Sequence, residues 1–449
     1  MELKINLPEN VKYLINKLTN SGYKAYAVGG CIRDSIMGLE PNDWDICTSA
    51  EPDMIVSVLG LPTIIKNGLR HGTVTVRFNG ESYEITTFRT DGVYSDNRRP
   101  ESVTFVTDVR EDLSRRDFTV NALAYNETDG LIDCFGGLDD IKNRMIRCVG
   151  DPDKRFAEDG LRLMRAVRFA SCLGFEIEEK TAQSIHNNRE LLKNISAERI
   201  TSELIKLLCG RNSEKILTDY PDLIGVFIPE ILPMVGFSQQ NPHHCYDVWI
   251  HTVKAVSFIE REPLLRIAAL FHDIGKPDCF TADEHGTGHF HGHPKRSAEL
   301  ARDIMTRLRL DNKTIDDSEV LIKLHDLRPP AKDKNVRRLL SKTGKELFPK
   351  LLSLKKADAL AQSSYMRAEK LRYIEQLRKV YEKVISSGDA YELKMLDING
   401  KDLISSGMRP GKDMGSVLNE LLSRVIEGEL PNEKQTLLKA AQEIRNSLS

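Results

Sequence analysis

The hydrophobic and polar positions of the chain follow two different periods. Between Tyr23 and about Leu131, short apolar or alternating runs are separated by glycine and aspartate, namely AYAVGG, WDICT, TVTVRF, YEITTF, SVTF and LIDCF. Runs of this length bounded by turn residues predict β-strands. Helical stretches lie between them, so we expect an α+β domain over residues 1–150.

After Gly150 the period changes to that of helices. The segment DPDKRFAEDGLRLMRAVRFASCLGF opens a series of helical patterns that continues almost to the C-terminus. Turn clusters such as PHH, RPPAKDK and SSGD interrupt this series. We therefore expect three all-α parts, over residues 151–240, 241–330 and 331–449.

The composition is that of a globular chain with several cores. The 449 residues are 40% hydrophobic, 29% charged and 6% aromatic. No run approaches the roughly 18 apolar residues of a membrane helix, and charges interrupt the N-terminal segment before a signal-peptide core could form. We expect a cytoplasmic protein with no membrane partner, and the oligomeric state is left open. The eight cysteines show no CxxC spacing, so we expect reduced thiols.

The net charge conceals a basic region. The chain has 64 basic and 66 acidic residues, a formal charge of −2. From Arg328 to Lys383, however, 16 Lys and Arg stand against 6 Asp and Glu, a local balance of +10 that leaves −12 for the other residues. This asymmetry indicates a surface for a polyanion, although solvated helix faces without a partner explain it equally well.

A glycine turn and a pair of aspartates suggest a phosphate and metal site. Gly29 and Gly30 end an apolar run and precede a helical pattern, so backbone N–H groups can approach an anion there, and Arg33 adds a positive charge. Asp43 and Asp45 occupy alternate positions of a predicted strand and share one face. Two adjacent carboxylates favour a divalent cation, and oxygen ligands suit Mg²⁺ with a triphosphate. A plain tight turn and a surface strand are the alternatives.

Several motifs together resemble one family. GGCIRD, DWDICT, TFRTDGVYSDNRRP, EDLSRRDFTVNALAYN, DPDKRFAEDGLRLMRAVRFA and ISAERI occur in this order over roughly residues 20–215. The succession resembles the bacterial class II tRNA nucleotidyltransferases, the CCA-adding enzymes, and bacterial poly(A) polymerases share most of these motifs. The resemblance implies a nucleotidyltransferase head with a mixed β-sheet, followed by an all-α neck, body and tail. It also implies addition of the 3′ CCA to tRNA from CTP and ATP without a nucleic-acid template.

The resemblance also assigns roles in the head. Nucleotidyl transfer requires an activated RNA 3′-hydroxyl and a stabilised pyrophosphate, which metal ions provide. Asp43 and Asp45 are the expected catalytic Mg²⁺ ligands, and Glu84 on a neighbouring run is a weaker third candidate. The residues expected at the nucleotide are Gly29, Gly30, Arg33 and Arg116. Around Arg116 the local sequence also fits an ordinary helix start with Asp117 near its N-terminus.

One helix carries the expected selectivity for the base. Asp159 offers only hydrogen-bond acceptors and Arg162 only donors, which match the pairing edges of cytosine and adenine. Guanine and uracil would leave like groups facing each other, at a cost of roughly 1 to 3 kcal/mol each. We expect Arg165 and Arg168 to support this pair or to hold phosphates. The alternative is an amphipathic surface helix in which Glu158 pairs with Arg162.

Residues 90–100 bear on which nucleotides are added. This polar segment has no regular period and resembles the flexible loop of full CCA-adding enzymes. A loop that redirects Asp159 and Arg162 would allow the pocket to switch from C to A, so addition of CC alone is disfavoured. An enzyme that adds only A would keep the loop and stays an alternative, and a poly(A) polymerase ranks third.

Seven of the 11 histidines fall between His251 and His325. With the pair His272-Asp273 they resemble the HD superfamily of metal-dependent phosphohydrolases, which implies an HD domain over residues 241–330. Imidazoles with one bridging carboxylate suit a transition metal. The expected ligands are His251, His272, Asp273, His293 and His325, and Asp326 competes with His325. We expect His285, His289 and His291 to be loop residues or substrate contacts.

The HD resemblance leaves functional alternatives open. It implies repair of 2′,3′-cyclic phosphates or 2′-phosphates, while a helical scaffold that has lost its metal is the other interpretation. A tRNA-binding HD phosphohydrolase whose head only docks RNA is the competing function from another class. Downstream, KKADAL, DINGKDLI and RPG resemble the tails of HD-containing tRNA nucleotidyltransferases. Together with the basic stretch from Arg328 to Lys383, they predict that this region binds the tRNA backbone by recognising its shape and its phosphates.

Overall fold

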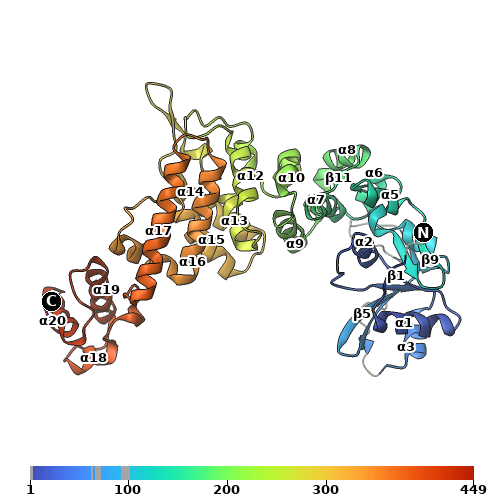
Figure 1. The fold of residues 1–449 in the computed structure, drawn as a ribbon, viewed down its shortest axis with the longest axis horizontal. Coiled ribbons are helices and arrows are strands. Elements are labelled where there is room, and N and C mark those ends of the chain that lie inside the picture. Colours follow the sequence, from blue (N-terminus) through green and yellow to red (C-terminus); the bar gives the residue numbers. More distant parts are fainter. Residues whose placement is uncertain (1–3, 62–63, 66–71, 93–101, 449) are drawn as a thin grey trace. The chain divides into compact units, whose positions relative to one another are not determined.

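The computed structural model describes residues 4–61, 64–65, 72–92 and 102–448. Contacts divide the chain into two compact units, Met1–Pro229 and Glu230–Ser449. The first unit contains a β-sheet followed by helices, and the second is mainly helical (Figure 1). The α+β class with a following all-α region is therefore confirmed. The finer division into four parts stays a prediction.

A seven-stranded sheet forms the centre of the first unit. Its strand order is β3-β4-β5-β2-β1-β8-β9. β2 pairs in parallel with β5 and the other neighbours are antiparallel, so the sheet is mixed, as predicted. The strands are β1 (Ala25–Val28), β2 (Ile46–Thr48), β3 (Ile64–Ile65), β4 (Thr73–Phe78), β5 (Glu81–Thr87), β8 (Leu123–Asn126) and β9 (Gly130–Asp133).

Strand β8 was not predicted, although it is central. Every one of its residues is buried, so its sequence LAYN shows no alternation. The helix start considered at Asp117 is wrong, because a short 3-10 turn, η2 (Thr119–Asn121), leads instead into this strand. All six predicted runs do contain or overlap strands. SVTF pairs as β7 (Val103–Phe105) with β6 (Arg89–Asp91), outside the main sheet.

Helices cover the sheet and define where the site lies. α1 (Glu9–Asn20) and α3 (Pro52–Leu59) lie side by side against it (Figure 1). α4 (Val109–Ser114) contributes Val109 and Leu113 to a hydrophobic cluster that also contains Tyr26 and Val28 of β1. α2 (Gly30–Ile36) begins directly after β1, so the glycine turn lies at the end of a central strand.

Further helices complete the first unit. After α5 (Gly137–Lys142), β10 (Met145–Ile146) pairs in parallel with β11 (Glu176–Ile177). Leu161, Met164 and Val167 of α7 are buried, as their spacing predicts. The helices after residue 150 are α6 (Pro152–Glu158), α7 (Leu161–Leu173), α8 (Glu179–Asn188), α9 (Ala197–Leu208), α10 (Ser213–Asp219) and α11 (Pro221–Gly225).

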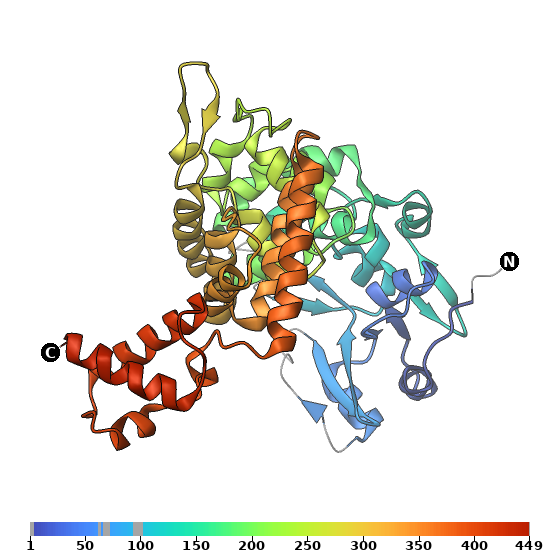
Figure 2. The ribbon, with the colours of Figure 1, turned by 60° about the vertical axis from the view of Figure 1, so that its left-hand side comes forward.

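The second unit is built from long helices. A small hairpin, β12 (Thr281–Ala282) with β13 (Gly288–His289), stands out from them in Figure 2. Trp249 is among the largest fully buried side chains. The helices of this part of the unit are α12 (Val248–Phe258), α13 (Pro263–Phe271), α14 (His293–Arg307), α15 (Asn312–Leu324), α16 (Asp333–Ala361) and α17 (Arg367–Ser387).

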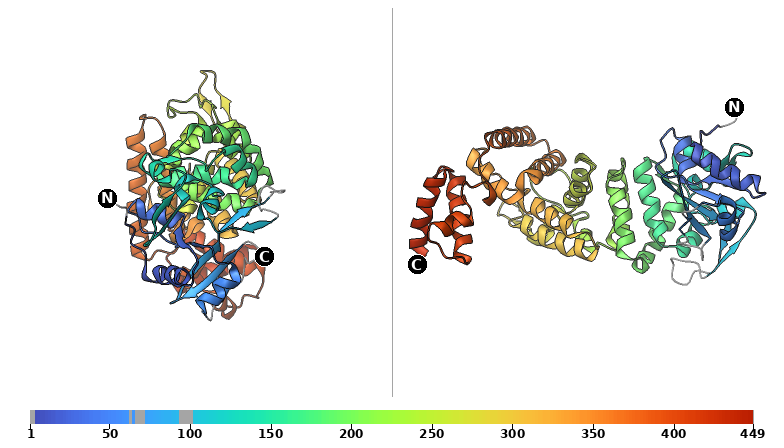
Figure 3. Two further views of the ribbon diagram at one scale, coloured as in Figure 1. Left: turned by 90° about the vertical axis from the view of Figure 1, so that its right-hand side faces the viewer. Right: turned by 90° about the horizontal axis from the view of Figure 1, so that it is seen from below.

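The last three helices have a core of their own. α18 (Gly400–Ser405), α19 (Lys412–Glu427) and α20 (Lys434–Leu448) group at the C-terminal end (Figure 3). Leu403, Val417, Leu421 and Leu437 are completely buried in their shared cluster. The break around Pro410 falls between α18 and α19, as the sequence predicts. In the described part of the chain, no helix has the length and apolar character needed to cross a membrane.

Candidate functional sites

A cavity of about 390 Å³ in the first unit, here called the head pocket, gathers most of the predicted nucleotide residues. Its walls come from the turn after β1, the segment before β2, the segment around η2, and α7. The predicted residues that line it are Gly29, Gly30, Arg33, Asp43, Asp45, Arg116, Arg165 and Arg168.

The glycine turn allows a close approach of an arginine. Gly29 has φ +86° and donates its N–H to the carbonyl of Leu123 at 3.0 Å. A Cβ at this position would lie 3.0 Å from Nη1 of Arg116, so a side chain would both strain the backbone and crowd that guanidinium. The Nε of Arg116 is buried without a hydrogen-bond partner, which leaves a donor available in the wall of the pocket.

Arg33 is held in a fixed orientation. Its guanidinium donates to Asn121 Oδ1 at 2.5 Å and forms a salt bridge with Asp34 at 2.7 Å. It also lies over the ring of Phe169, 5.1 Å from the centroid. Arg33 is therefore a preorganised positive group and not a freely moving side chain.

Asp43 and Asp45 lie just before β2, not within it as the alternating pattern had suggested. The protein around Asp45 displaces water and raises its pKa, Arg116 opposes this rise, and the negative charges of Glu84 and Asp43 add to it. No salt bridge to either aspartate occurs among the described residues. Carboxylates crowded in this way, with no cationic partner, fit a divalent cation. Glu84 contributes charge but does not line the pocket.

Asp117, which the sequence suggested only as a helix cap, is an organising residue of the head pocket. Its carboxylate accepts from Arg165 Nε at 2.8 Å and from Asn121 Nδ2 at 3.2 Å. Burial alone would raise the pKa of Asp117, but the charge and hydrogen bonds of Arg165 dominate and lower it to about 2. The neutralised pair fixes Arg165 of α7 against the segment that follows α4.

The side chain of Arg168 is also supported from both sides. Its Nε donates to Glu203 Oε2 at 2.7 Å, and its guanidinium lies 3.5 Å from the centroid of Phe169. Phe169 in turn meets Phe118 edge to face at 5.8 Å. The sequence reasoning missed Phe169 and Glu203, because their partners are distant in the chain and no local spacing signals them.

The proposed base-reading residues, Asp159 and Arg162, do not line the head pocket. Arg162 donates to Glu158 Oε2 at 2.6 Å and to the backbone carbonyl of Arg155 at 3.1 Å, and this is the i,i+4 pair that we considered as the alternative. Asp159 accepts from Arg199 Nη2 at 3.1 Å. Their role in base selection stays a prediction. The loop segment 93–101 lies outside the described residues.

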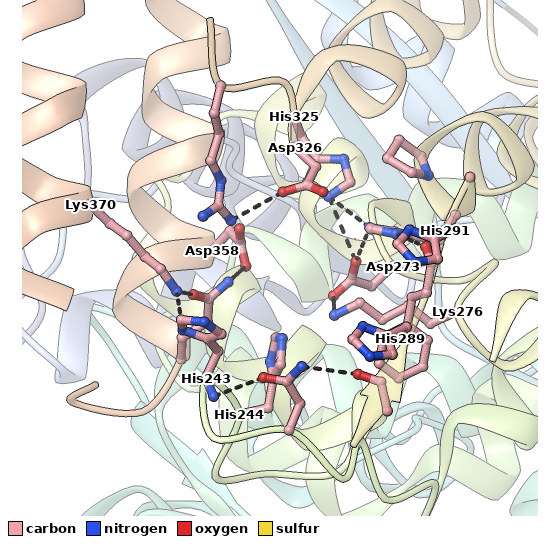
Figure 4. A pocket seen from close by; sticks show the side chains of 18 residues that line it. His243, His244, Asp273, Lys276, His289, His291, His325, Asp326, Asp358 and Lys370 are labelled. Carbon is pink, nitrogen blue, oxygen red and sulfur yellow. Dashed lines mark hydrogen bonds and ion pairs between the residues drawn. The ribbon is translucent and has the colours of Figure 1, made fainter. Parts of the chain in front are cut away.

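A second cavity, of about 280 Å³, lies in the second unit and is here called the histidine pocket (Figure 4). Asp273 is at its base. Its Oδ2 lies 3.1 Å from His251 Nε2 and 3.2 Å from His272 Nε2. Its Oδ1 lies 3.3 Å from His293 Nε2 and 3.7 Å from His325 Nε2. The structure thus brings all five predicted ligands of this site together.

Each of these four imidazoles is oriented by a backbone carbonyl. The Nδ1 atoms of His272, His293 and His325 lie 2.7 to 2.8 Å from the carbonyl oxygens of residues 269, 290 and 322, and that of His251 lies 3.3 Å from the carbonyl of Ala361. Such a contact places the proton on Nδ1 and leaves the Nε2 lone pair facing the cluster. This is the arrangement in which histidine binds metal.

Asp358 of α16 completes the group and was missed. Its Oδ1 lies 3.2 Å from His251 Nε2, and two overlapping sets of potential metal ligands share Asp273. Asp358 stands in KKADAL, where a single carboxylate within an apolar helical stretch was the available signal. Asp326, the competitor of His325, instead forms a salt bridge with Arg328 at 3.1 Å.

Lys276 also contacts the cluster. Its Nζ lies 2.7 Å from Asp273 Oδ2 and donates to Gln239 Oε1 at 2.8 Å. The pKa of Asp273 is held well below its usual range, because His272 and Lys276 outweigh the cost of its burial. The charges at the base of the pocket thus favour an ionised carboxylate, and a carboxylate beside several imidazoles suits a transition-metal ion.

The chain is similar to known proteins over nearly its whole length. Family models match at residues 25–147 (Poly A polymerase head domain), 174–224 (RNA and SrmB-binding site of polymerase A) and 293–441 (tRNA nucleotidyltransferase domain 2). A CCA-adding enzyme of Lactobacillus helveticus is 34% identical over 96% of both chains. One from Lactobacillus delbrueckii is 51% identical over 46% of this chain and 52% of its own.

Solved structures of CCA-adding enzymes are also similar to this chain. The Bacillus stearothermophilus CCA-adding enzyme in complex with CTP has a TM-score of 0.72 and 31% identity, covering 98% of this chain and 99% of its own. The Thermotoga maritima CCA-adding enzyme complexed with tRNA has a TM-score of 0.61 at 22% identity, covering 98% and 95%. The likeness to the Thermotoga maritima enzyme is evidence for a shared fold alone.

The ion pair between Asp117 and Arg165 predicts a pH-dependent stability. Because the folded pKa of Asp117 is about 2 against an ordinary 3.8, its contribution is complete above pH 3.8 and is lost as the pH falls towards 2. We expect Asp117→Asn to lower the free energy of unfolding by about 2 kcal/mol at pH 7, and by less at pH 3. Denaturant unfolding of both proteins at pH 7, 4 and 3 measures this difference.

Asp139→Asn serves as the control, because its side chain is 74% exposed and pairs only with Lys142 at the surface. We expect a change within about 0.5 kcal/mol at every pH. A loss for Asp117→Asn that stays the same from pH 7 to pH 3 would contradict the assigned role of the ionised pair.

Proposed function

The chain belongs to the family of CCA-adding enzymes, and we propose that it builds and repairs the 3′ CCA end of tRNA from CTP and ATP. The observation that carries this proposal is the head pocket. There, a glycine turn, two carboxylates without a salt bridge among the described residues, and four arginines from three segments of the chain face one cavity. The relative of known structure with 31% identity, which is in complex with CTP, supports the same class of substrate.

In this proposal the carboxylates of Asp43 and Asp45 hold Mg²⁺, which supplies the Lewis-acid chemistry that nucleotidyl transfer requires. Arg33 and Arg116 bind the triphosphate. Arg33 is held by Asn121 before the nucleotide arrives and costs little reorganisation, and Arg116 forms a salt bridge with Asp112 at 3.4 Å while its Nε stays available as a donor. Arg165 and Arg168 add positive charge from the side of α7. Glu84 acts only through its negative charge near Asp45.

The basic stretch between Arg328 and Lys383 provides the proposed tRNA contact. It covers α16 and most of α17, and residues 293–441 match the second tRNA nucleotidyltransferase domain. Phosphate contacts of this kind recognise backbone shape and not base sequence.

The function is tested with a tRNA that lacks CCA and with each labelled nucleotide in turn. We expect incorporation of C, C and then A. Incorporation of A alone onto tRNA ending in CC would instead identify an A-adding enzyme, and long A tails on generic RNA would identify a poly(A) polymerase. If neither C nor A is incorporated into the tRNA, the proposal is contradicted.

Removal of either proposed Mg²⁺ ligand should abolish transfer. We expect Asp43→Ala or Asp45→Ala to lower the transfer rate by more than about 100-fold, since even residues that merely orient metal ligands cost 10- to 100-fold. Affinity for tRNA, measured by filter binding, should stay within about twofold, because these carboxylates hold metal and not RNA. Asp53→Ala, an exposed aspartate on α3, is the matched control. Near-normal transfer by Asp45→Ala would remove it from the catalytic role.

Base selection by Asp159 and Arg162 requires a rearrangement. In this proposal the nucleotide base replaces Arg199 as the partner of Asp159, and Arg162 turns from Glu158 towards the base. We expect Asp159→Ala to weaken discrimination against UTP and GTP by about 5- to 150-fold, the equivalent of 1 to 3 kcal/mol. Arg33→Ala should weaken all four nucleotides alike, because a triphosphate carries no base identity.

Incorporation of each nucleotide by the variants on one tRNA measures this selectivity. A uniform loss for Asp159→Ala, with the preference for C and A unchanged, would show that the residue is structural. Selectivity would then come from other groups of the pocket.

The histidine pocket supports a second activity, metal-dependent hydrolysis of phosphoesters. A bound transition metal would supply Lewis-acid activation of a phosphoester and of water. His251, His272 and Asp358 would hold one ion on the Oδ2 side of Asp273, and His293 and His325 a second on the Oδ1 side. The substrates implied by the HD resemblance are 2′,3′-cyclic phosphates and 2′-phosphates of RNA.

Metal content tests this site without an activity assay. After loading with Ni²⁺ or Mn²⁺ and dialysis, we expect the wild-type chain to retain two ions in the second unit and Asp273→Asn to retain none. His325→Ala should retain one, because only the Oδ1 side loses a ligand. His285→Ala, an exposed histidine of the hairpin, should match the wild type. A wild-type chain without retained transition metal would support the scaffold that has lost its metal.

A further inference from the structure

Lys370 places a positive charge in the wall of the histidine pocket without a negative partner. Its Nζ lies 3.3 Å from Nδ1 of His243 and donates to Oε1 of Gln362, and both groups are neutral acceptors. No carboxylate forms a salt bridge with it in the described ranges. Loss of hydration, aided by Arg328, lowers the pKa of Lys370. A partly buried ammonium with only neutral partners favours the arrival of an anion.

An exposed aromatic surface adjoins this lysine. The rings of His243 and Tyr365 lie 4.8 Å apart at 54°, and we call these two side chains the aromatic shelf. Tyr365 is 53% exposed, whereas His243 lines the pocket itself. Figure 4 shows His243 beside Lys370, with His289 and His291 on the other side of the view. The shelf therefore lies next to the unpaired cation at the edge of the cavity.

The shelf is held rigidly. The backbone N–H of Ser363 donates to the carbonyl of His243 at 2.9 Å, and its hydroxyl donates to the carbonyl of Pro242 at 2.7 Å. The N–H of Tyr365 then donates to the Ser363 hydroxyl oxygen at 3.2 Å. Met366, which begins the next helix, has φ +53°, a conformation that an ordinary side chain rarely adopts. Hydrogen bonds thus join the segment before α17 to the segment before α12 and anchor the backbone that carries Tyr365.

We propose that the histidine pocket has a nucleotide subsite in which Lys370 pairs with a phosphate and the aromatic shelf stacks on the base of a terminal RNA nucleotide. The proposal rests on the phosphohydrolase function and adds to it a basis for choosing RNA ends over small phosphoesters. Stacking on an aromatic ring tolerates every base, because each base has a π-face. The subsite would accept any single-stranded 3′ end whose phosphate reaches Lys370.

Calorimetry with the full chain tests the subsite directly. The probes are adenosine 2′-monophosphate and inorganic phosphate, in buffer with chelator so that no metal contributes. We expect Tyr365→Ala to weaken binding of the nucleotide by about 5- to 150-fold, the range for loss of one base stack, and to leave binding of inorganic phosphate unchanged. Tyr365→Phe should restore nucleotide binding, because the ring and not the hydroxyl makes the stack.

Two more variants separate the parts of the subsite. Lys370→Met should weaken the nucleotide and inorganic phosphate alike, because it removes the charge that both probes use. Tyr13→Ala is the control: Tyr13 is 45% exposed and stacks on Phe78 at 4.9 Å, but it belongs to the first unit and adjoins no proposed site. It should leave both affinities unchanged.

The outcomes distinguish this inference from the function on which it rests. An unchanged nucleotide affinity in Tyr365→Ala, or an equal loss for inorganic phosphate, would overturn the subsite. Hydrolysis of adenosine 2′,3′-cyclic phosphate by the metal-loaded wild type tests the phosphohydrolase function separately. If no hydrolysis occurs but binding still depends on Tyr365, the hydrolase is refuted and the nucleotide subsite stands.

Discussion

The ion pair between the buried carboxylate of Asp117 and the partly exposed guanidinium of Arg165 joins two walls of the head pocket. Asp117 belongs to the segment that leads into the central strand β8, and Arg165 belongs to α7. The two residues are 48 positions apart in the sequence. Either charge alone in this location would be costly, so each holds the other in place. Phe169 follows on the same helix, and the guanidinium of Arg33 lies over its ring. The ion pair thus anchors the wall of the pocket that α7 provides, while Asn121 and Glu203 separately hold Arg33 and Arg168.

The two pockets offer a cation different sets of donor atoms. In the head pocket, oxygen ligands crowd together near solvent, which suits a hard ion that keeps part of its hydration. In the histidine pocket, four imidazoles locked by backbone carbonyls surround one deeply buried carboxylate, which suits a softer ion and fixed coordination.

The sequence predicted what lies close together along the chain. The glycine turn with Arg33 and the aspartates at 43 and 45 were found from local spacing, and the imidazoles with Asp273 from the resemblance to the HD superfamily. The structure gathers them in two separate groups. Strand β8 was not predicted, because complete burial removes the alternation of apolar and polar residues that marks a strand. The roles of Asp117 and Asp358 in their pockets were not predicted, because their partners lie far away in the sequence. Arg165 is 48 residues from Asp117, and His251 is 107 residues from Asp358. Arg162 can pair with Glu158 or, in the proposed function, with a nucleotide base. The spacing of these residues in the sequence does not decide between the two partners.

The position of β1 in the sheet has a consequence for how the protein emerges from the ribosome. β1 pairs with β2 on one side and with β8 on the other, so Ala27 faces Tyr125, almost a hundred residues later in synthesis. Contacts of such long range form slowly and only once both segments are available. The strand that presents the glycine turn therefore waits, exposed along one edge, until residue 126 has left the exit tunnel. Translation speed over residues 30–126 thus sets how long an unpaired strand edge is open to wrong partners.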